Sequence, residues 1–128
     1  MQEIFFDNRN DEKIFKKVIF LSNEEVISDL QDFVVNGENY TSKKFKSNQN
    51  IGVVSAMKFE NVTRIFSYET EIAAANADFI ILSGNENHTK STKSLLNRLA
   101  ETWKKFEFID EKIYQNKVSK HFLGQDNF

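Results

Sequence analysis

The sequence predicts an α+β domain in which an antiparallel meander sheet is packed by two to three amphipathic helices. Short alternating segments between Thr63 and Leu82 are typical of neighbouring strands. On both sides of them, apolar residues recur every three or four positions, which indicates helices. The length of 128 residues, 40% of them hydrophobic, fits one core. We therefore expect residues 1–128 to form a single domain.

The first expected elements are a strand and a helix. Residues 14–21 mix β-branched and aromatic residues with lysines and predict a strand. Residues 22–36 predict a helix, because Ser22 and Glu25 form a capping box and apolar residues follow at helical spacing. The pair Asn36-Gly37 predicts that the helix ends with Gly37 in the left-handed conformation.

The middle of the chain predicts the sheet. Residues 38–50 are polar and basic and predict a loop with at most one edge strand. Strands are expected at 51–59, 62–68, 70–75 and 79–82, with a turn at 76–78. Because these connections are too short for parallel crossovers, we expect antiparallel pairing.

The C-terminal third predicts two more helices. One begins near Thr89 within a Ser/Thr/Lys-rich run whose hydroxyls can cap free amides. Its inward residues are expected to be Leu95, Leu96, Leu99, Trp103 and Phe106. The other covers residues 110–122, with Ile113, Tyr114, Val118 and Phe122 on its apolar side, and ends at Gly124.

The composition excludes several classes of protein. The absence of Cys excludes disulfides, thiolate zinc sites and cysteine catalysis. No apolar run approaches the roughly 18 residues of a membrane helix. The N-terminus has neither a basic region nor a long apolar stretch, so no signal peptide is expected and we predict a cytoplasmic protein.

Catalytic patterns are weak. His88 and His121 are the only histidines, and neither has a second ligand four residues away. We therefore expect no catalytic residue, metal or cofactor, and not an enzyme. One less favoured hypothesis is a metal-dependent enzyme that uses Glu69 and Glu71, since alternate residues of a strand project from the same face.

The charge is distributed in blocks, although the net charge is only −2. Residues 65–86 carry four acidic side chains and no basic one. These residues, which we expect to bind a basic groove on a partner protein, are Glu69, Glu71, Asp78 and Glu86.

Two basic groups support a nucleic-acid-binding alternative. An aromatic residue and lysines alternate in the loop around residues 43–46, and further lysines line the face of the second helix. The residues are Tyr40, Lys43, Lys44, Lys46, Lys90, Lys93 and Lys104. The negative net charge and the scarcity of Arg count against this alternative.

The segment Ser67-Tyr68-Glu69-Thr70-Glu71-Ile72-Ala73 is followed by the helix start Thr89-Lys90-Ser91-Thr92-Lys93. Together they resemble small phage-encoded proteins of unknown function, which carry a Ser-Tyr-x-Thr-x-Ile-Ala hairpin followed by a Ser/Thr/Lys-rich helix start. The resemblance covers about forty residues and departs at Ser94, where the family has His. It implies a phage or mobile-element origin and no catalytic residue.

The leading hypothesis is a phage or mobile-element accessory protein that acts by stoichiometric protein binding. An anti-CRISPR-type inhibitor of a host defence nuclease is one example, so the expected partner is a host or phage protein. Small size, the lack of a catalytic constellation and segregated charge favour this hypothesis. The edge of a meander and 13 Phe residues also leave room for a homodimer.

Overall fold

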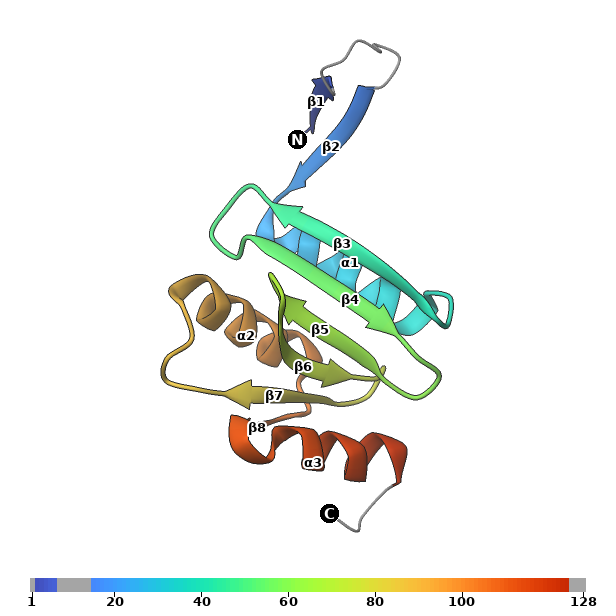
Figure 1. The fold of residues 1–128 in the computed structure, drawn as a ribbon, viewed down its shortest axis with the longest axis vertical. Coiled ribbons are helices and arrows are strands. Elements are labelled where there is room, and N and C mark those ends of the chain that lie inside the picture. Colours follow the sequence, from blue (N-terminus) through green and yellow to red (C-terminus); the bar gives the residue numbers. More distant parts are fainter. Residues whose placement is uncertain (1, 7–14, 125–128) are drawn as a thin grey trace.

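The structure, a computed structural model, describes residues 2–6 and 15–124. Eight strands hydrogen-bond in chain order. They are β1 (Gln2–Phe6), β2 (Phe15–Leu21), β3 (Thr41–Ser47), β4 (Val53–Lys58), β5 (Thr63–Ser67), β6 (Thr70–Ala75), β7 (Ile80–Gly84) and β8 (Phe106–Asp110). The helices are α1 (Asn23–Asn36), α2 (Lys90–Trp103) and α3 (Glu111–Leu123). Figure 1 shows α1 and α2 behind the sheet and α3 at its lower end.

The α+β prediction is confirmed, but the sheet is mixed rather than purely antiparallel. The pairs β2–β3 and β7–β8 are parallel, and the pairs from β3 to β7 are antiparallel. Each parallel pair is joined by a helix, α1 or α2, which is long enough for a crossover. The strand β8 was not predicted, because Phe106 was assigned to the second predicted helix and Asp110 to the start of the third.

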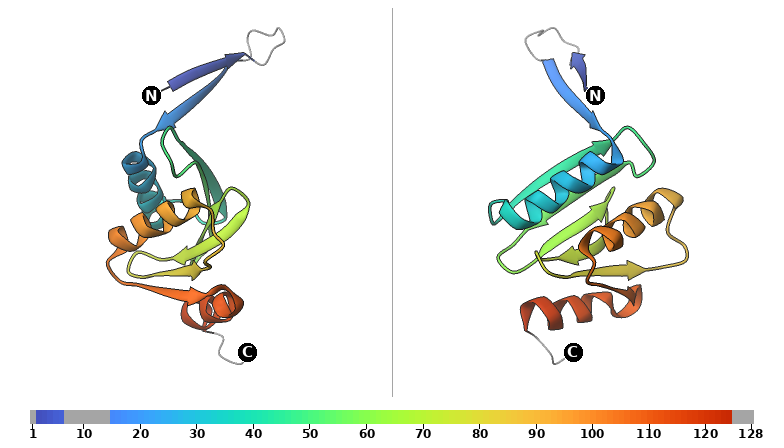
Figure 2. Two further views of the ribbon diagram at one scale, coloured as in Figure 1. Left: turned by 90° about the vertical axis from the view of Figure 1, so that its left-hand side faces the viewer. Right: turned by 180° about the vertical axis from the view of Figure 1, so that it is seen from behind.

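The hairpin of β1 and β2 extends away from the other elements, as both views in Figure 2 show. β2 pairs with β1 along its length but joins β3 only through Phe20 and Leu21. The predicted strand is therefore confirmed from Phe15 onward, and its first expected residue, Ile14, lies outside the described residues.

The start of α1 is confirmed and its predicted end is wrong in one respect. The Glu25 amide donates to Ser22 Oγ at 3.1 Å, and the Ser22 amide donates to Glu25 Oε1 at 2.8 Å. Gly37 ends the helix with φ −66° and ψ 162°, which is extended and not left-handed. Glycine is needed there for space, because a Cβ would lie 2.6 Å from Phe33 Cδ1.

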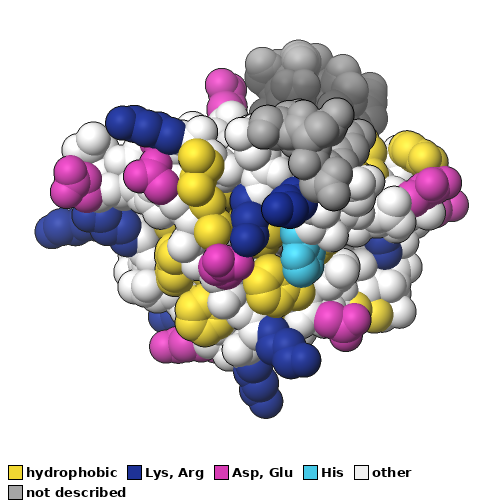
Figure 3. Space-filling view, turned by 90° about the horizontal axis from the view of Figure 1, so that it is seen from below, with side chains coloured by type: hydrophobic (Ala, Val, Ile, Leu, Met, Phe, Trp, Pro, Cys, Tyr) yellow, Lys and Arg dark blue, Asp and Glu magenta, His cyan; other side chains and the backbone are white. Residues whose placement is uncertain are grey.

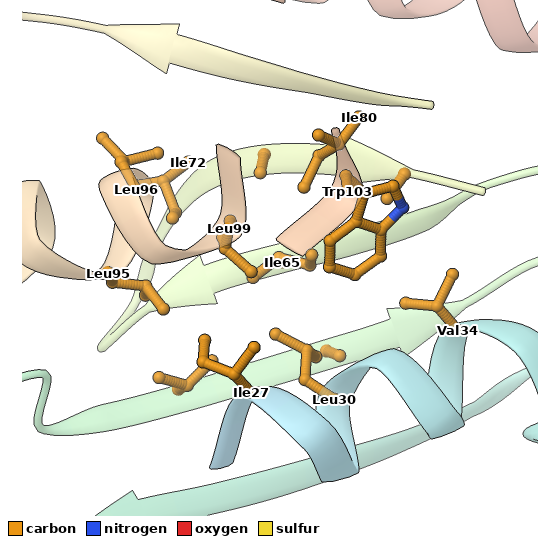
Figure 4. Packing of buried hydrophobic residues seen from close by; sticks show 14 of the residues in the cluster. Ile27, Leu30, Val34, Ile65, Ile72, Ile80, Leu95, Leu96, Leu99 and Trp103 are labelled. Carbon is orange, nitrogen blue, oxygen red and sulfur yellow. The ribbon is translucent and has the colours of Figure 1, made fainter. Parts of the chain in front are cut away.

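The main core lies between the sheet and the two helices α1 and α2 (Figure 4). Leu30 from α1 and Leu99 from α2 have no exposed surface, and neither does Ile65 from β5 between them. The predicted inward faces of both helices are confirmed, except for Phe106. That residue lies in β8 and is 45% exposed.

A bulge in β6 adapts the sheet to this core. Ile65 pairs with Ala73 while Phe66 pairs with Glu71, so Ile72 has no partner on β5. Ile72 and Ala73 are consequently both buried in the main core. The alternation along β6 is shifted, and Glu71 faces away from α1 and α2.

A second, smaller core lies on the opposite face under α3. Tyr114, Val118 and Phe122 pack there against residues that include Ala74 and Ile81. α3 ends at Gly124, as predicted, and this glycine adopts the left-handed conformation. Ile113, which was expected on the apolar side, is instead 54% exposed. No helix within residues 2–6 and 15–124 is long and apolar enough to cross a membrane.

Candidate functional site

The sheet has one face covered by α1 and α2 and another on which α3 packs over β6, β7 and β8. On β3 to β5, residues next to buried ones in sequence point toward this second face. Together with Glu71 they form what we call the open face. Its members are Ser42, Lys44, Lys46, Val53, Ser55, Met57, Arg64, Phe66 and Glu71.

The basic segment 38–50, predicted as a loop with at most one edge strand, forms strand β3 over most of its first ten residues, so more of it is strand than the word loop implied. It pairs with β4 over six residues and with β2 at its end. Phe45 is the only apolar residue in the strand, and a single residue reveals no alternation. Because Phe45 points into the main core, Lys44 and Lys46 lie on the open face, whereas Lys43 shares the side of Phe45.

The turn between β5 and β6 places Tyr68 at the edge of the open face. Tyr68 has φ 56°, a left-handed conformation that is uncommon for a residue with a bulky side chain. Its amide donates to the Val53 carbonyl at 3.0 Å, which fixes the turn against β4. Its phenol lies over Gly52, where a Cβ would be 3.1 Å from Tyr68 Cζ. The side chain is nevertheless 55% exposed.

Two adjoining hollows meet at Tyr68 and Thr70, and we call them together the Tyr68 hollow. One, of about 550 Å³, is lined by Lys44, Lys46, Val53, Tyr68, Glu69 and Thr70. The other, of about 510 Å³, continues to the start of α2 and is lined by Ser67, Tyr68, Thr70, Ile72, Asn87, His88, Thr89, Ser91 and Thr92. Two lysines therefore line one hollow and several hydroxyl groups line the other, and the exposed Tyr68 ring borders both.

The start of α2 confirms the predicted capping role of its hydroxyl-rich run. The Thr92 amide donates to Thr89 Oγ1 at 3.3 Å, and the buried hydroxyls of Ser67 and Thr92 lie 2.8 Å apart. His88 Nε2 lies 3.0 Å from the Ser83 carbonyl oxygen, which orients the ring. The first turn of α2 carries no acidic residue, so the positive end of its dipole faces the hollow uncompensated.

The four acidic residues expected to bind a partner do not form one surface. Glu69 lies in the β5–β6 turn and Glu86 follows β7, at the same end of the sheet. Asp78 lies in the β6–β7 turn at the other end. The premise that Glu69 and Glu71 share a strand face is wrong, because Glu69 belongs to the turn.

Glu71 holds α3 on the sheet. Its carboxylate accepts hydrogen bonds from Arg64 at 2.8 Å and from the Tyr114 hydroxyl at 2.9 Å. Burial, together with the Glu71 charge, raises the pKa of Tyr114 far above its usual value. Gln115 bonds both Arg64 and Glu71, so this polar cluster links β5, β6 and α3.

The other basic candidates are dispersed. Tyr40 precedes β3 and lines a separate hollow with Glu60, whose charge raises the pKa of the Tyr40 phenol. Lys90 and Lys93 begin α2, next to the Tyr68 hollow. Lys104 follows the last residue of the same helix, about 20 Å from Lys90.

Sequence reasoning missed Tyr68, Thr70, His88 and Ser91 as site residues. The available signal was a tyrosine in a two-residue hairpin turn, where Gly or Asn is usual. This signal could be recognised only once the end of β5 and the start of β6 were known.

Within the described residues, no three His, Asp or Glu side chains lie together in a group that could hold a metal ion. No protein-family model, curated protein or solved structure matches the chain. The geometry of the Tyr68 hollow therefore carries the functional argument.

Proposed function

We propose that this protein is a non-catalytic binding module for single-stranded nucleic acid and that the Tyr68 hollow is its binding surface. The observation that carries the proposal is the convergence of Lys44, Lys46 and the exposed Tyr68 ring beside the part of the second sheet face that α3 leaves uncovered. Single-strand binders combine cations for the phosphates with aromatic rings on which bases stack.

The open face supplies further groups suited to this ligand. Phe66 lies on β5 directly beside Ser55, whose small side chain leaves room above the sheet. Met57, 42% exposed, extends the apolar part of the surface. At the other end of the hollow, the first turn of α2 offers hydroxyl groups and a positive dipole to a phosphate.

The charge of the protein limits the affinity expected. Arg64 is paired with Glu71, and Glu69 lines the hollow itself. Only a few phosphates can therefore be neutralised, so binding should be moderate and should rely on stacking more than on charge.

The test is fluorescence anisotropy with labelled single-stranded DNA, RNA and duplex DNA across a salt series. We expect single strands to bind better than duplex, whose bases are already stacked. Replacing both lysines (K44Q/K46Q) should weaken binding and reduce the slope of log K against log salt by about 1.4 in magnitude, since each phosphate contact contributes about 0.7.

The matched control is K112Q/K120Q, which removes the same charge from exposed positions of α3. It should leave the affinity close to that of the parent protein. Equal losses of affinity in both variants would mean that net charge, and not the position of the lysines, determines binding. An absence of binding to any oligonucleotide at low salt would refute the proposal.

A second candidate is stoichiometric binding of a protein, such as an anti-CRISPR-type inhibition of a defence nuclease. Its support is the position of the exposed acids Glu69 and Glu86, which lie at the same end of the sheet as the hollow. A purified basic partner that binds in a 1:1 ratio after nuclease treatment, and more weakly to E69K/E86K, would favour this candidate.

A further inference from the structure

The strand β8 is the last strand of the sheet and exposes two aromatic side chains at its edge. Phe106 and Phe108 are each 45% exposed, and their rings form an edge-to-face pair with centroids 6.0 Å apart. Figure 3 views the molecule from this end and shows hydrophobic side chains at the surface among lysines and acids. This edge is not part of the Tyr68 hollow.

Natural edge strands are usually protected against pairing by a lysine, a proline or a bulge within the strand. The residues of β8, Phe-Glu-Phe-Ile-Asp, contain no lysine or proline, and their pairing with β7 is regular over five residues. The charge of Glu107 is directed toward Lys117 of α3, 3.8 Å away. The outer edge of β8 is therefore open to another strand.

The charges that flank β8 have a definite polarity. Lys104 and Lys105 precede the strand, whereas Asp110 ends it and Glu111 follows. A second copy in antiparallel orientation would place the basic end of each strand beside the acidic end of the other. A parallel copy would place like charges together, which is unfavourable.

From this self-complementarity we infer that β8 pairs with β8 of a second copy of this chain, as an antiparallel two-fold dimer that continues the sheet across both protomers. The aromatic side chains of both strands then lie on one face of the joined sheet, where cross-strand aromatic contacts stabilise pairing. A two-fold interface uses the same patch twice, and β8 carries both complementary ends. The inference does not depend on the nucleic-acid proposal.

The first measurement is the mass in solution by sedimentation over a range of protein concentrations. We expect a monomer–dimer equilibrium. Phe108→Lys, which adds an edge lysine, should give a monomer, with the fold checked by circular dichroism. The control Val35→Lys alters a comparably exposed residue on α1 and should leave the dimer intact. A parent protein that is monomeric at all concentrations would overturn the inference.

The second measurement uses the charge polarity. K104E/K105E makes both ends of β8 acidic, and D110N/E111K makes both ends basic while Asn keeps the cap of α3. Each variant alone should dimerise at least about tenfold more weakly, and their mixture should recover a heterodimer. A dimer insensitive to both changes, or no recovery in the mixture, would place the interface elsewhere.

Because the chain has no native cysteine, single-cysteine variants give an independent check. A two-fold axis at β8 brings a residue beside its own copy, so Glu107→Cys or Phe108→Cys should form an intermolecular disulfide under mild oxidation. Val35→Cys should not. Cross-linking at Val35 alone, or at none of the three positions, would contradict the proposed pairing.

Discussion

The two faces of one sheet serve different purposes in this protein. The face under α1 and α2 is packed with aliphatic side chains and Trp103, many without exposed surface. The open face carries lysines, serines, Met57 and Phe66 on the same strands. Since neighbouring residues of a strand point to opposite faces, each strand contributes to both. Substitutions at neighbouring residues of one strand should therefore alter stability and binding separately.

The largest expected effect is a cavity in the covered face. Leu99→Ala removes a side chain with no exposed surface from the centre of the main core and should lower the free energy of unfolding by about 3 kcal/mol. Met57→Ala, on the open face of β4, should change it by less than about 0.5 kcal/mol. Urea unfolding of both variants measures the difference. Comparable losses would mean that the open face is buried in solution.

A smaller effect is expected where α3 meets the open face. Tyr114→Phe removes the hydrogen bond to Glu71 and should cost about 1 kcal/mol at neutral pH. Burial raises the pKa of Tyr114 in the folded protein above its unfolded value near 10. Its contribution is therefore present below pH 10 and lost as pH rises further.

Tyr114→Phe should accordingly make the alkaline loss of stability less steep than in the parent protein. Thermal unfolding at neutral and alkaline pH, with the exposed Tyr68→Phe as control, tests this difference. Identical alkaline profiles for Tyr114→Phe and the parent would show that the phenol ionises as readily folded as unfolded.

The sequence predicted the covered face well because that face is defined by apolar periodicity. The stripes of α1 and α2, the capping box at Ser22 and the strand β6 all lie where the pattern indicated. These features depend on residues near one another in the chain. A helix or strand shows the same spacing of apolar residues whichever element it packs against, so this spacing can be read from the sequence alone.

The open face and β8 could not be predicted in the same way. A single apolar residue, Phe45, marks β3 as a strand, and Phe106 in β8 continues an apolar helical spacing from Trp103. The bulge at Ile72 then reverses the side to which Glu71 would point. The role of Glu71 in holding α3 depends on Tyr114, which lies 43 residues away in sequence, and local spacing carries no information on such a contact.

The next prediction separates binding from stability at one residue. Tyr68→Gly removes the exposed ring and suits the positive φ of the turn, so stability should stay within about 1 kcal/mol of the parent. Oligonucleotide affinity should nevertheless fall by about 1–3 kcal/mol, the contribution of one stacked base. The control Tyr40→Gly, at φ 65° outside the hollow, should retain affinity. A large loss of stability in Tyr68→Gly would show that the ring stabilises the fold and is not available only for binding.

The smallest expected effect concerns the capping box at the exposed start of α1, one of the two helices that pack on the covered face. The Ser22 amide and hydroxyl lower the pKa of Glu25 below its ordinary value of 4.5 in the folded protein. The resulting stabilisation is present above the unfolded pKa and is lost as pH falls through the folded one.

The variant Glu25→Gln can still accept a hydrogen bond from the Ser22 amide, so the free energy of unfolding should change little at neutral pH. Because glutamine does not titrate, the gap between variant and parent should narrow or reverse in acid, measured by thermal unfolding between pH 3 and 7. Glu101→Gln, an exposed change on α2, is the control, and the same acid profile in both variants would mean that the capping carboxylate contributes no pH-dependent stability.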